Sequence, residues 1–165
     1  MARKCFYSFH YEPDNWRVSK IRNIGSVEGN KLASDNDWET VTGGGNKAIE
    51  KWIQDQLKGR TCTIILAGSN TANRKWINYE IEESWKKNKG LLVIHIHNIT
   101  DKNDKQSSKG KNPLYYVTDS STGKRLSTIA KSYDPPRSTS KEVYSYISDN
   151  IENWIEEAIK IRKDN

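Results

Sequence analysis

Cysteine, methionine and long apolar runs are scarce in this sequence. Its 165 residues include two cysteines, one methionine and two phenylalanines, and apolar residues make up 34% of the chain. No stretch approaches the roughly 18 consecutive apolar residues that a membrane-spanning helix needs, so no membrane segment is expected. The first residues, Met1–Phe6, enter a strand-like run directly, which predicts no signal peptide. Cys5 and Cys62 form no CxxC motif, which favours a reduced, cytoplasmic protein.

What the chain does contain is an excess of positive charge and many large aromatic residues. Lysine and arginine number 27 against 21 acidic residues, a formal net charge of +6, and there are six tryptophans and eight tyrosines. The charge favours anionic partners such as nucleotides, phosphates or nucleic acid without choosing among them. Much of it lies in residues 86–111, a lysine-rich stretch typical of a solvated loop. The length predicts a single domain over residues 1–165.

Three short apolar runs indicate buried strands. They cover Lys4–His10, Thr61–Ala67 and Leu91–Ile96. The last two are almost continuously aliphatic or β-branched, as strands covered on both faces are. Because helical patterns lie between the runs, the order of elements predicts an α/β fold with a short central parallel sheet flanked by helices.

Helical periodicity fills the intervals between these strands. A first helix is expected to begin near Asp14, and a second near Asn46 with Gly59 as its stop signal. A third is expected to follow Asn73, a candidate N-cap, and to run through Trp85. Residues 25–45, which end in a triple glycine, are expected to be irregular. The inward-facing residues predicted for the first helix are Trp16, Val18, Ile21 and Ile24.

The C-terminal third is less regular until its last segment. Residues 98–113 are polar and predict a mobile loop, and residues 115–117 and 126–130 predict a late hairpin or edge strands. A closing helix over residues 140–162 is the clearest element. Thr139 and Glu142 form a capping box at its start, and an apolar stripe runs from Val143 to Ile159.

Two charged residues fall inside the apolar arcs of their helices. With Trp76 at zero and a helical turn of about 100° per residue, Glu80 lies at about 40°, between Trp76 and Ile77. The same count places Arg17 within the apolar arc of the first helix. Both residues follow strands, at the carboxyl edge of a parallel sheet, where open α/β folds bind ligands. Two interpretations stay open, a structural Arg–Glu pair or a ligand site.

Other chemical motifs are weaker. His95 and His97 form an H-x-H pair on a strand, but no third ligand at a suitable spacing accompanies them, so no metal site is predicted. The two cysteines lack a placed base for nucleophilic catalysis. The triple glycine Gly43–Gly45 is followed by no GK[ST], which excludes a P-loop.

Four motifs in combination resemble a known family. They are SFHY with Asp14 and Arg17, then DWE at 37–39, then SNT with the R.W..YEI pattern through Glu80, and finally KGKNP at 109–113. In this combination and order the chain resembles the TIR-like family that includes the TIR-domain sensor subunits of the bacterial Thoeris anti-phage system. The resemblance covers a core of residues 1–117, and residues 118–165 form a C-terminal extension.

The resemblance implies a flavodoxin-like, three-layer TIR fold and an activity. TIR enzymes cleave the bond between nicotinamide and ribose in NAD with a glutamate that Glu80 matches. The chain would therefore be an NAD glycohydrolase or ADP-ribosyl cyclase, with NAD as substrate and no bound cofactor. The cyclic ADP-ribose-type product would be a diffusible messenger that activates a separate effector protein. A phage-derived trigger and self-association into a homo-oligomer are the further partners that the resemblance suggests.

The same resemblance suggests binding residues around Glu80. Arg17 would clamp a phosphate or carboxylate group, and Ser8 and His10 would line the pocket from the end of the first strand. A ring from Trp38 or Trp76 would stack on a base or on nicotinamide. Asp14 and Arg74 complete the matched set of binding residues.

Two other functions stay open at this point. Many TIR domains are non-catalytic interaction modules, although the glycine-bearing loop through which ordinary TIR domains assemble has only Gly43–Gly45 as a positional candidate here. For such a module, surface substitutions would matter and Glu80→Gln would not. A nucleic-acid binder that uses residues 86–111 would instead show a steep dependence on salt.

Overall fold

The fold is known from a computed structural model that describes residues 2–30 and 43–165. Over these residues the chain forms five parallel strands in the order β2-β1-β3-β4-β5. The strands are β1 (Arg3–Ser8), β2 (Val27–Gly29), β3 (Cys62–Ala67), β4 (Gly90–His95) and β5 (Lys131–Tyr133). This is the strand order of flavodoxin-like folds. The predicted α/β class and parallel sheet are therefore confirmed.

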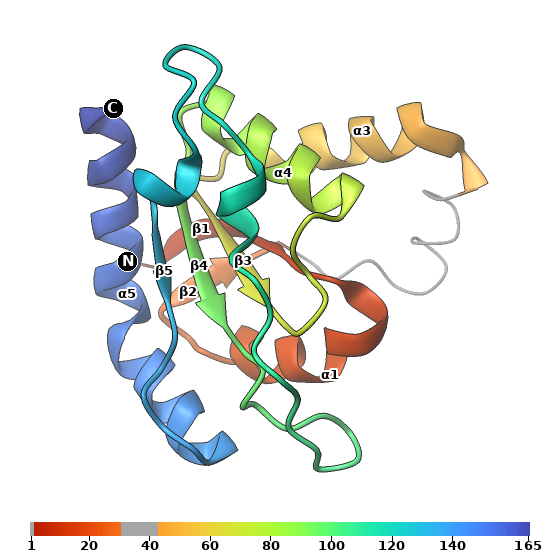
Figure 1. The fold of residues 1–165 in the computed structure, drawn as a ribbon, viewed down its shortest axis with the longest axis vertical. Helices are drawn as coiled ribbons and strands as arrows, with labels where there is room; N and C mark the ends of the chain where they lie inside the picture. The colour runs from red at the N-terminus through yellow and green to blue at the C-terminus, as the bar shows by residue number, and fades with distance from the viewer. Residues whose placement is uncertain (1, 31–42) are drawn as a thin grey trace.

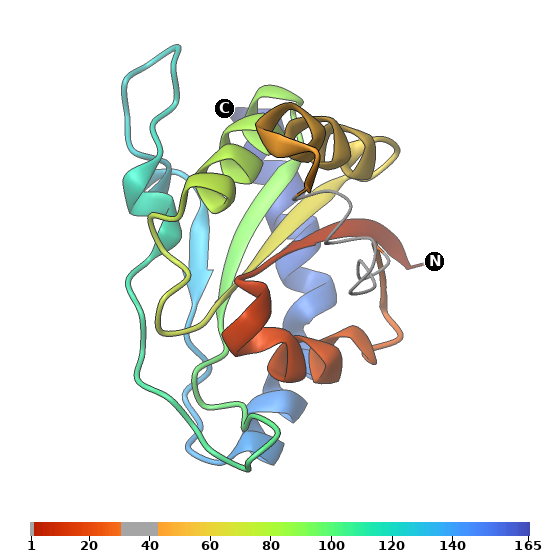
Figure 2. The same cartoon turned by 90° about the vertical axis from the view of Figure 1, so that its right-hand side faces the viewer.

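Helices cover both faces of the sheet and complete three layers (Figures 1 and 2). α1 (Tyr11–Arg22) and α5 (Ser140–Asp164) pack on one face, while α3 (Gly45–Leu57) and α4 (Lys75–Lys86) pack on the other. Every residue of β3 and β4 is buried. Their continuous apolar runs follow from this two-sided cover.

The two edge strands were not predicted. β2 lies within a region expected to be irregular, and β5 follows the segment for which a hairpin was expected. In place of that hairpin the chain forms two short 3₁₀ turns, Pro113–Tyr116 and Leu126–Thr128, joined through a single antiparallel bridge between Thr118 and Arg125. The edge strands have three residues each, too few to produce a recognisable alternation.

The first helix begins earlier and faces the core differently than predicted. α1 starts at Tyr11 rather than near Asp14, and its buried stripe contains Val18 and Ile21 as expected. Trp16 is 49% exposed, so its predicted inward position is wrong. The reason is that a charged pair, Asp14 and Arg17, occupies the buried stripe that an apolar residue would normally fill.

Among the described residues, a side-chain cap is present at the start of α5 and absent from the starts of α3 and α4. At α5 the Thr139 hydroxyl accepts from the backbone N–H of Glu142 at 3.2 Å and donates to the Glu142 carboxylate at 2.7 Å, so the predicted capping pair is present. At α4 the N-cap is Arg74 rather than Asn73. Asn73 instead adopts a left-handed backbone with a φ of 62°, and its side chain accepts from Asn78 at 3.2 Å. No helix among residues 2–30 and 43–165 is long and apolar enough to cross a membrane.

Candidate active site

A cleft of about 530 Å³ opens at the carboxyl edge of the sheet. One wall is the end of β1 and the start of α1, and the other is the first half of α4 with the residues before it. The lining residues are Phe9, His10 and Tyr11 on the first wall and Asn73, Arg74, Lys75, Trp76, Ile77 and Glu80 on the second. The strand order reverses direction between β1 and β3, and this is the switch point at which open α/β sheets bind ligands.

Glu80 is the buried ionisable residue of this cleft. It lies on the inner face of α4 beside Ile77 and Ile81, as the helical count predicts, and only 8% of it is exposed. Burial raises the pKa of Glu80 to about 8, and the nearby Ser8 hydroxyl offsets a small part of the rise. Its Oε2 atom makes no hydrogen bond to any described residue. A buried carboxylate oxygen without a partner is costly unless a ligand or water completes it.

The rim of the cleft carries positive charge and an aromatic ring. Arg74 and Lys75 are exposed at the start of α4, where the helix dipole also favours an anion. The Lys75 Nζ atom lies 4.8 Å from the centre of the Trp76 ring, which packs edge-to-face on Tyr79 at 5.7 Å. The cleft therefore combines a deep carboxylate with a cationic, aromatic rim.

Three of the predicted binding residues lie on this cleft and one lies beneath it. His10, Arg74 and Trp76 line the walls, and Ser8 is buried at the end of β1. Trp38 lies outside the described residues.

Arg17 and Asp14 form a separate pair. Arg17 Nη1 lies 3.1 Å from Asp14 Oδ1, and the guanidinium also donates to backbone oxygens of Pro13, Ile99 and Lys105. These bonds engage Nε, Nη1 and Nη2, and the residue does not line the cleft. The structure therefore does not place Arg17 as a phosphate clamp. The structural Arg–Glu pair is also wrong, because the partner of Arg17 is Asp14 and not Glu80.

Comparison with known proteins shows the family of this chain. Residues 6–101 match the family described as Thoeris protein ThsB, TIR-like domain. This chain belongs to the ThsB TIR-like family. A curated relative from Bacillus cereus (strain MSX-D12) bears the name "Putative cyclic ADP-D-ribose synthase ThsB1"; it is 35% identical over 133 residues, which cover 76% of this chain and 69% of the relative.

Several cleft residues of this ThsB-family chain were not predicted. They are Phe9, Tyr11, Asn73, Lys75 and Ile77. Phe9 and Tyr11 lie within the SFHY motif, and Ile77 lies next to Glu80 in the helical count. The motif and the helical count could therefore have indicated these three residues. The positions of Asn73 and Lys75 relative to the cleft depend on the residue at which α4 begins. A sequence pattern does not fix that residue to within one position, so these two could not be assigned to the cleft.

The remaining ionisable candidates of this ThsB-family chain lie away from the cleft. His95 and His97 are both buried, and burial lowers the pKa of His95 to about 4. Within the described residues, no three histidine, cysteine or acidic side chains gather as a metal site. Cys5 and Cys62 are buried free thiols on paired strands, and burial raises the pKa of Cys62.

The buried carboxyl group makes the stability of this ThsB-family chain depend on pH. The pKa of Glu80 is about 8 in the folded chain against an ordinary value of 4.5, so the folded state holds a proton that the unfolded state has released between these values. The contribution of Glu80 to the free energy of unfolding is therefore highest below about pH 4.5. It falls as the pH rises from there to about 8, because the unfolded state has released the proton that the folded state still holds. Glu80→Gln should therefore gain stability relative to wild type as the pH rises from about 5 to about 8.

Denaturant unfolding at several pH values measures this difference. Asp14, whose pKa burial also raises, titrates in both proteins and cancels in the comparison. A constant difference in unfolding free energy across this range would contradict the buried, unpaired state of Glu80.

Proposed function

We propose that this chain cleaves NAD between nicotinamide and ribose and closes the ADP-ribose portion into a cyclic messenger. The single observation that carries the proposal is the Glu80 carboxylate, buried in the cleft with one oxygen unpaired. The name of the Bacillus cereus relative supports the same product class.

The chemistry needs one well-placed carboxylate. When the ribose–nicotinamide bond breaks, its electron pair leaves with nicotinamide and positive charge develops on the ribose. An anion close to the ribose stabilises this oxocarbenium character. Nicotinamide leaves as a neutral molecule because it is already cationic in NAD, so no acid is required to protonate it. Glu80 in the free chain holds a proton below about pH 8. The positive charge of bound NAD would lower the pKa of Glu80 and favour the carboxylate that this role needs.

The remaining groups of the cleft suit the rest of the dinucleotide. Arg74 and Lys75 at the start of α4 would hold the pyrophosphate, with support from the helix dipole. Trp76 or Tyr11 would contact a ring of the substrate, and the apolar side chains of Phe9 and Ile77 would limit the access of water. A hydroxyl of the ADP-ribose portion would then attack the ribose carbon and release its proton. The product is a cyclic form of ADP-ribose, one water lighter than free ADP-ribose.

The released messenger would act on a separate effector protein, and a component of the infecting phage would trigger its synthesis. Membership of a Thoeris family supports the proposal of these partners. The proposal needs no resident cofactor, since NAD is the substrate.

Mass spectrometry of small molecules tests the proposal. Extracts are prepared from cells with and without the chain, each before and after phage infection. We expect a product one water lighter than ADP-ribose only in infected cells that hold the chain, together with a rise in free nicotinamide over the other samples. Protection of the cells without either compound would contradict the proposal and favour a non-catalytic interaction module.

A further inference from the structure

Asp14 and Arg17 are buried charges that the proposed reaction does not use. Asp14 is 2% exposed and Arg17 is 4% exposed, although neither lines the cleft. Placing two charges in the interior is costly, and an apolar pair would fill the space with less penalty. The hydrogen bonds and contacts of Asp14 and Arg17 therefore indicate why a charged pair occupies this position.

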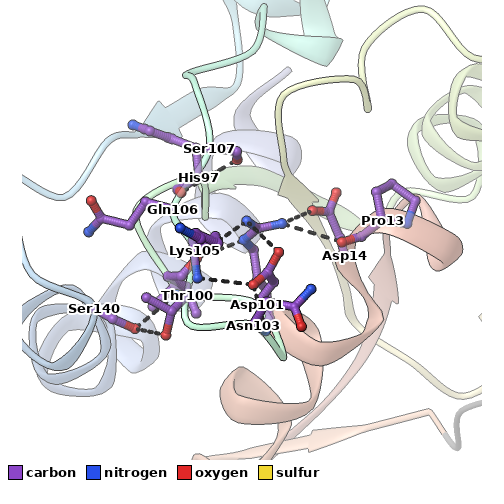
Figure 3. A network of polar contacts seen from close by, with 12 residues as sticks. Pro13, Asp14, His97, Thr100, Asp101, Asn103, Lys105, Gln106, Ser107 and Ser140 are labelled. Carbon is purple, nitrogen blue, oxygen red and sulfur yellow. Dashed lines mark hydrogen bonds and ion pairs between the residues drawn. The ribbon is translucent and has the colours of Figure 1, made fainter.

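Arg17 ties α1 to a segment that is far away in the sequence. Its Nε donates to the Ile99 carbonyl at 2.7 Å and its Nη2 to the Lys105 carbonyl at 3.0 Å. Figure 3 shows Asp14 and Lys105 on opposite sides of this network. The predicted mobile loop is thus attached to α1 by backbone acceptors. This is the fork geometry of a guanidinium, which a lysine ammonium does not reproduce.

Asp14 supports the loop that leads from β3 into α4. The Thr71 hydroxyl lies beside the Asp14 carboxylate and lowers its pKa, and it accepts from the backbone N–H of Gly68 at 2.9 Å. A Cβ atom added to Gly68 would lie 2.2 Å from Asp14 Oδ2, so the carboxylate presses directly on this glycine. A Cβ atom added to Gly110 would in turn lie 2.3 Å from the Gly68 carbonyl oxygen. The loop is therefore clamped between Asp14 and the segment that Arg17 anchors.

Both walls of the cleft adjoin segments that Asp14 and Arg17 contact. Residues 73 and 74, at the end of the clamped loop, form the start of one wall. His10 and Tyr11 belong to the other wall and begin α1, in which the Arg17 guanidinium donates to the Pro13 carbonyl at 3.3 Å. We propose that Asp14 and Arg17 are positioning residues that set the separation of the two cleft walls and thereby limit the access of water to the reacting ribose.

The consequence is a choice between two products, and this inference rests on the proposed function. After nicotinamide leaves, the ribose carbon forms a bond either to a hydroxyl of the same ADP-ribose or to water. The first route releases a proton and gives the cyclic product; the second consumes one water, releases a proton and gives linear ADP-ribose. A wider cleft admits water and favours the second route.

The ratio of linear to cyclic product in infected cells tests this inference. Thr71→Val removes the hydroxyl link with little change of shape and should raise the ratio by about tenfold. Thr71→Ser keeps the hydroxyl and should retain the wild-type ratio. Arg17→Lys keeps the charge but loses the fork, and should also raise the ratio. Lys20→Met is the control, because Lys20 binds the same distant segment at Thr100, one turn along α1, without touching the β3–α4 loop.

The outcomes separate this inference from the proposed function. Turnover by all variants with an unchanged product ratio would overturn the positioning role and leave the proposed function intact. A rise in the ratio that Lys20→Met or Thr71→Ser shows equally would also overturn it, since a general loss of rigidity would then be the cause. Absence of nicotinamide release by the wild-type chain would overturn the proposed function and the inference with it.

Discussion

Replacing Glu80 with glutamine is expected to reduce the rate of nicotinamide release by about 10²–10³-fold. Glutamine has nearly the same shape and can still accept a hydrogen bond, but it cannot supply the negative charge that the developing oxocarbenium needs. The rate is measured from nicotinamide released per folded protein in extracts of infected cells. The folded fraction is expected to be at least that of wild type, because the substitution removes a buried ionisable group.

Glu82→Gln is the matched control for this change. Glu82 lies on the same helix two residues further on, but its side chain is exposed. The control should retain the wild-type rate, because its charge is screened by water and lies outside the cleft. A rate for Glu80→Gln within a fewfold of that control, with both variants folded, would exclude Glu80 from the chemistry.

The second large effect is expected on stability. Arg17→Met should lower the free energy of unfolding by about 3–5 kcal/mol, because it leaves the Asp14 carboxylate buried without its cation. Burial raises the pKa of Asp14 and Arg17 opposes the rise. Without the arginine, the pKa of Asp14 should rise further, so the loss of stability should be larger at pH 8 than at pH 5. Denaturant unfolding at the two pH values measures this.

Two further variants show whether loss of the buried ion pair causes the lower stability expected for Arg17→Met. Arg3→Met breaks the ion pair with Glu156, in which Arg3 donates two hydrogen bonds of 2.8 and 2.7 Å, but both side chains are about half exposed. This control should cost far less stability than Arg17→Met, because water screens the exposed pair. The double substitution of Asp14→Asn with Arg17→Met removes the unpaired charge and should recover part of the loss. Equal costs for Arg17→Met and Arg3→Met would contradict the account of the buried pair.

Helical periodicity was sufficient to predict the burial of Glu80, and the resemblance to TIR enzymes supplied its catalytic role. Glu80 falls inside an arc that Trp76, Ile77 and Ile81 define within a single helix, so a local count reveals it. The inner strands β3 and β4 could also be predicted from the sequence, because burial on both faces requires continuous apolar runs.

The partner of Arg17 was not predictable in the same way. A helical count shows that Arg17 is buried but not what it binds, and two of its acceptors are backbone carbonyls 82 and 88 residues away. Every residue has a carbonyl, so no side-chain pattern marks Ile99 or Lys105. The misplaced Trp16 has the same origin, since the count assumed that apolar residues and not a charged pair would fill the buried face of α1.

Identification of the NAD-derived products is the most direct test of the central claim, that Glu80 in this cleft drives cleavage and cyclisation of NAD. Cells expressing the wild-type chain, Glu80→Gln or Glu82→Gln are infected, and their extracts are compared by mass spectrometry. We predict a rise in nicotinamide and a cyclic ADP-ribose isomer with the wild type and Glu82→Gln, and a level of the cyclic product about 10²–10³-fold lower with Glu80→Gln. The same cyclic product at the same level from a folded Glu80→Gln chain would contradict the claim.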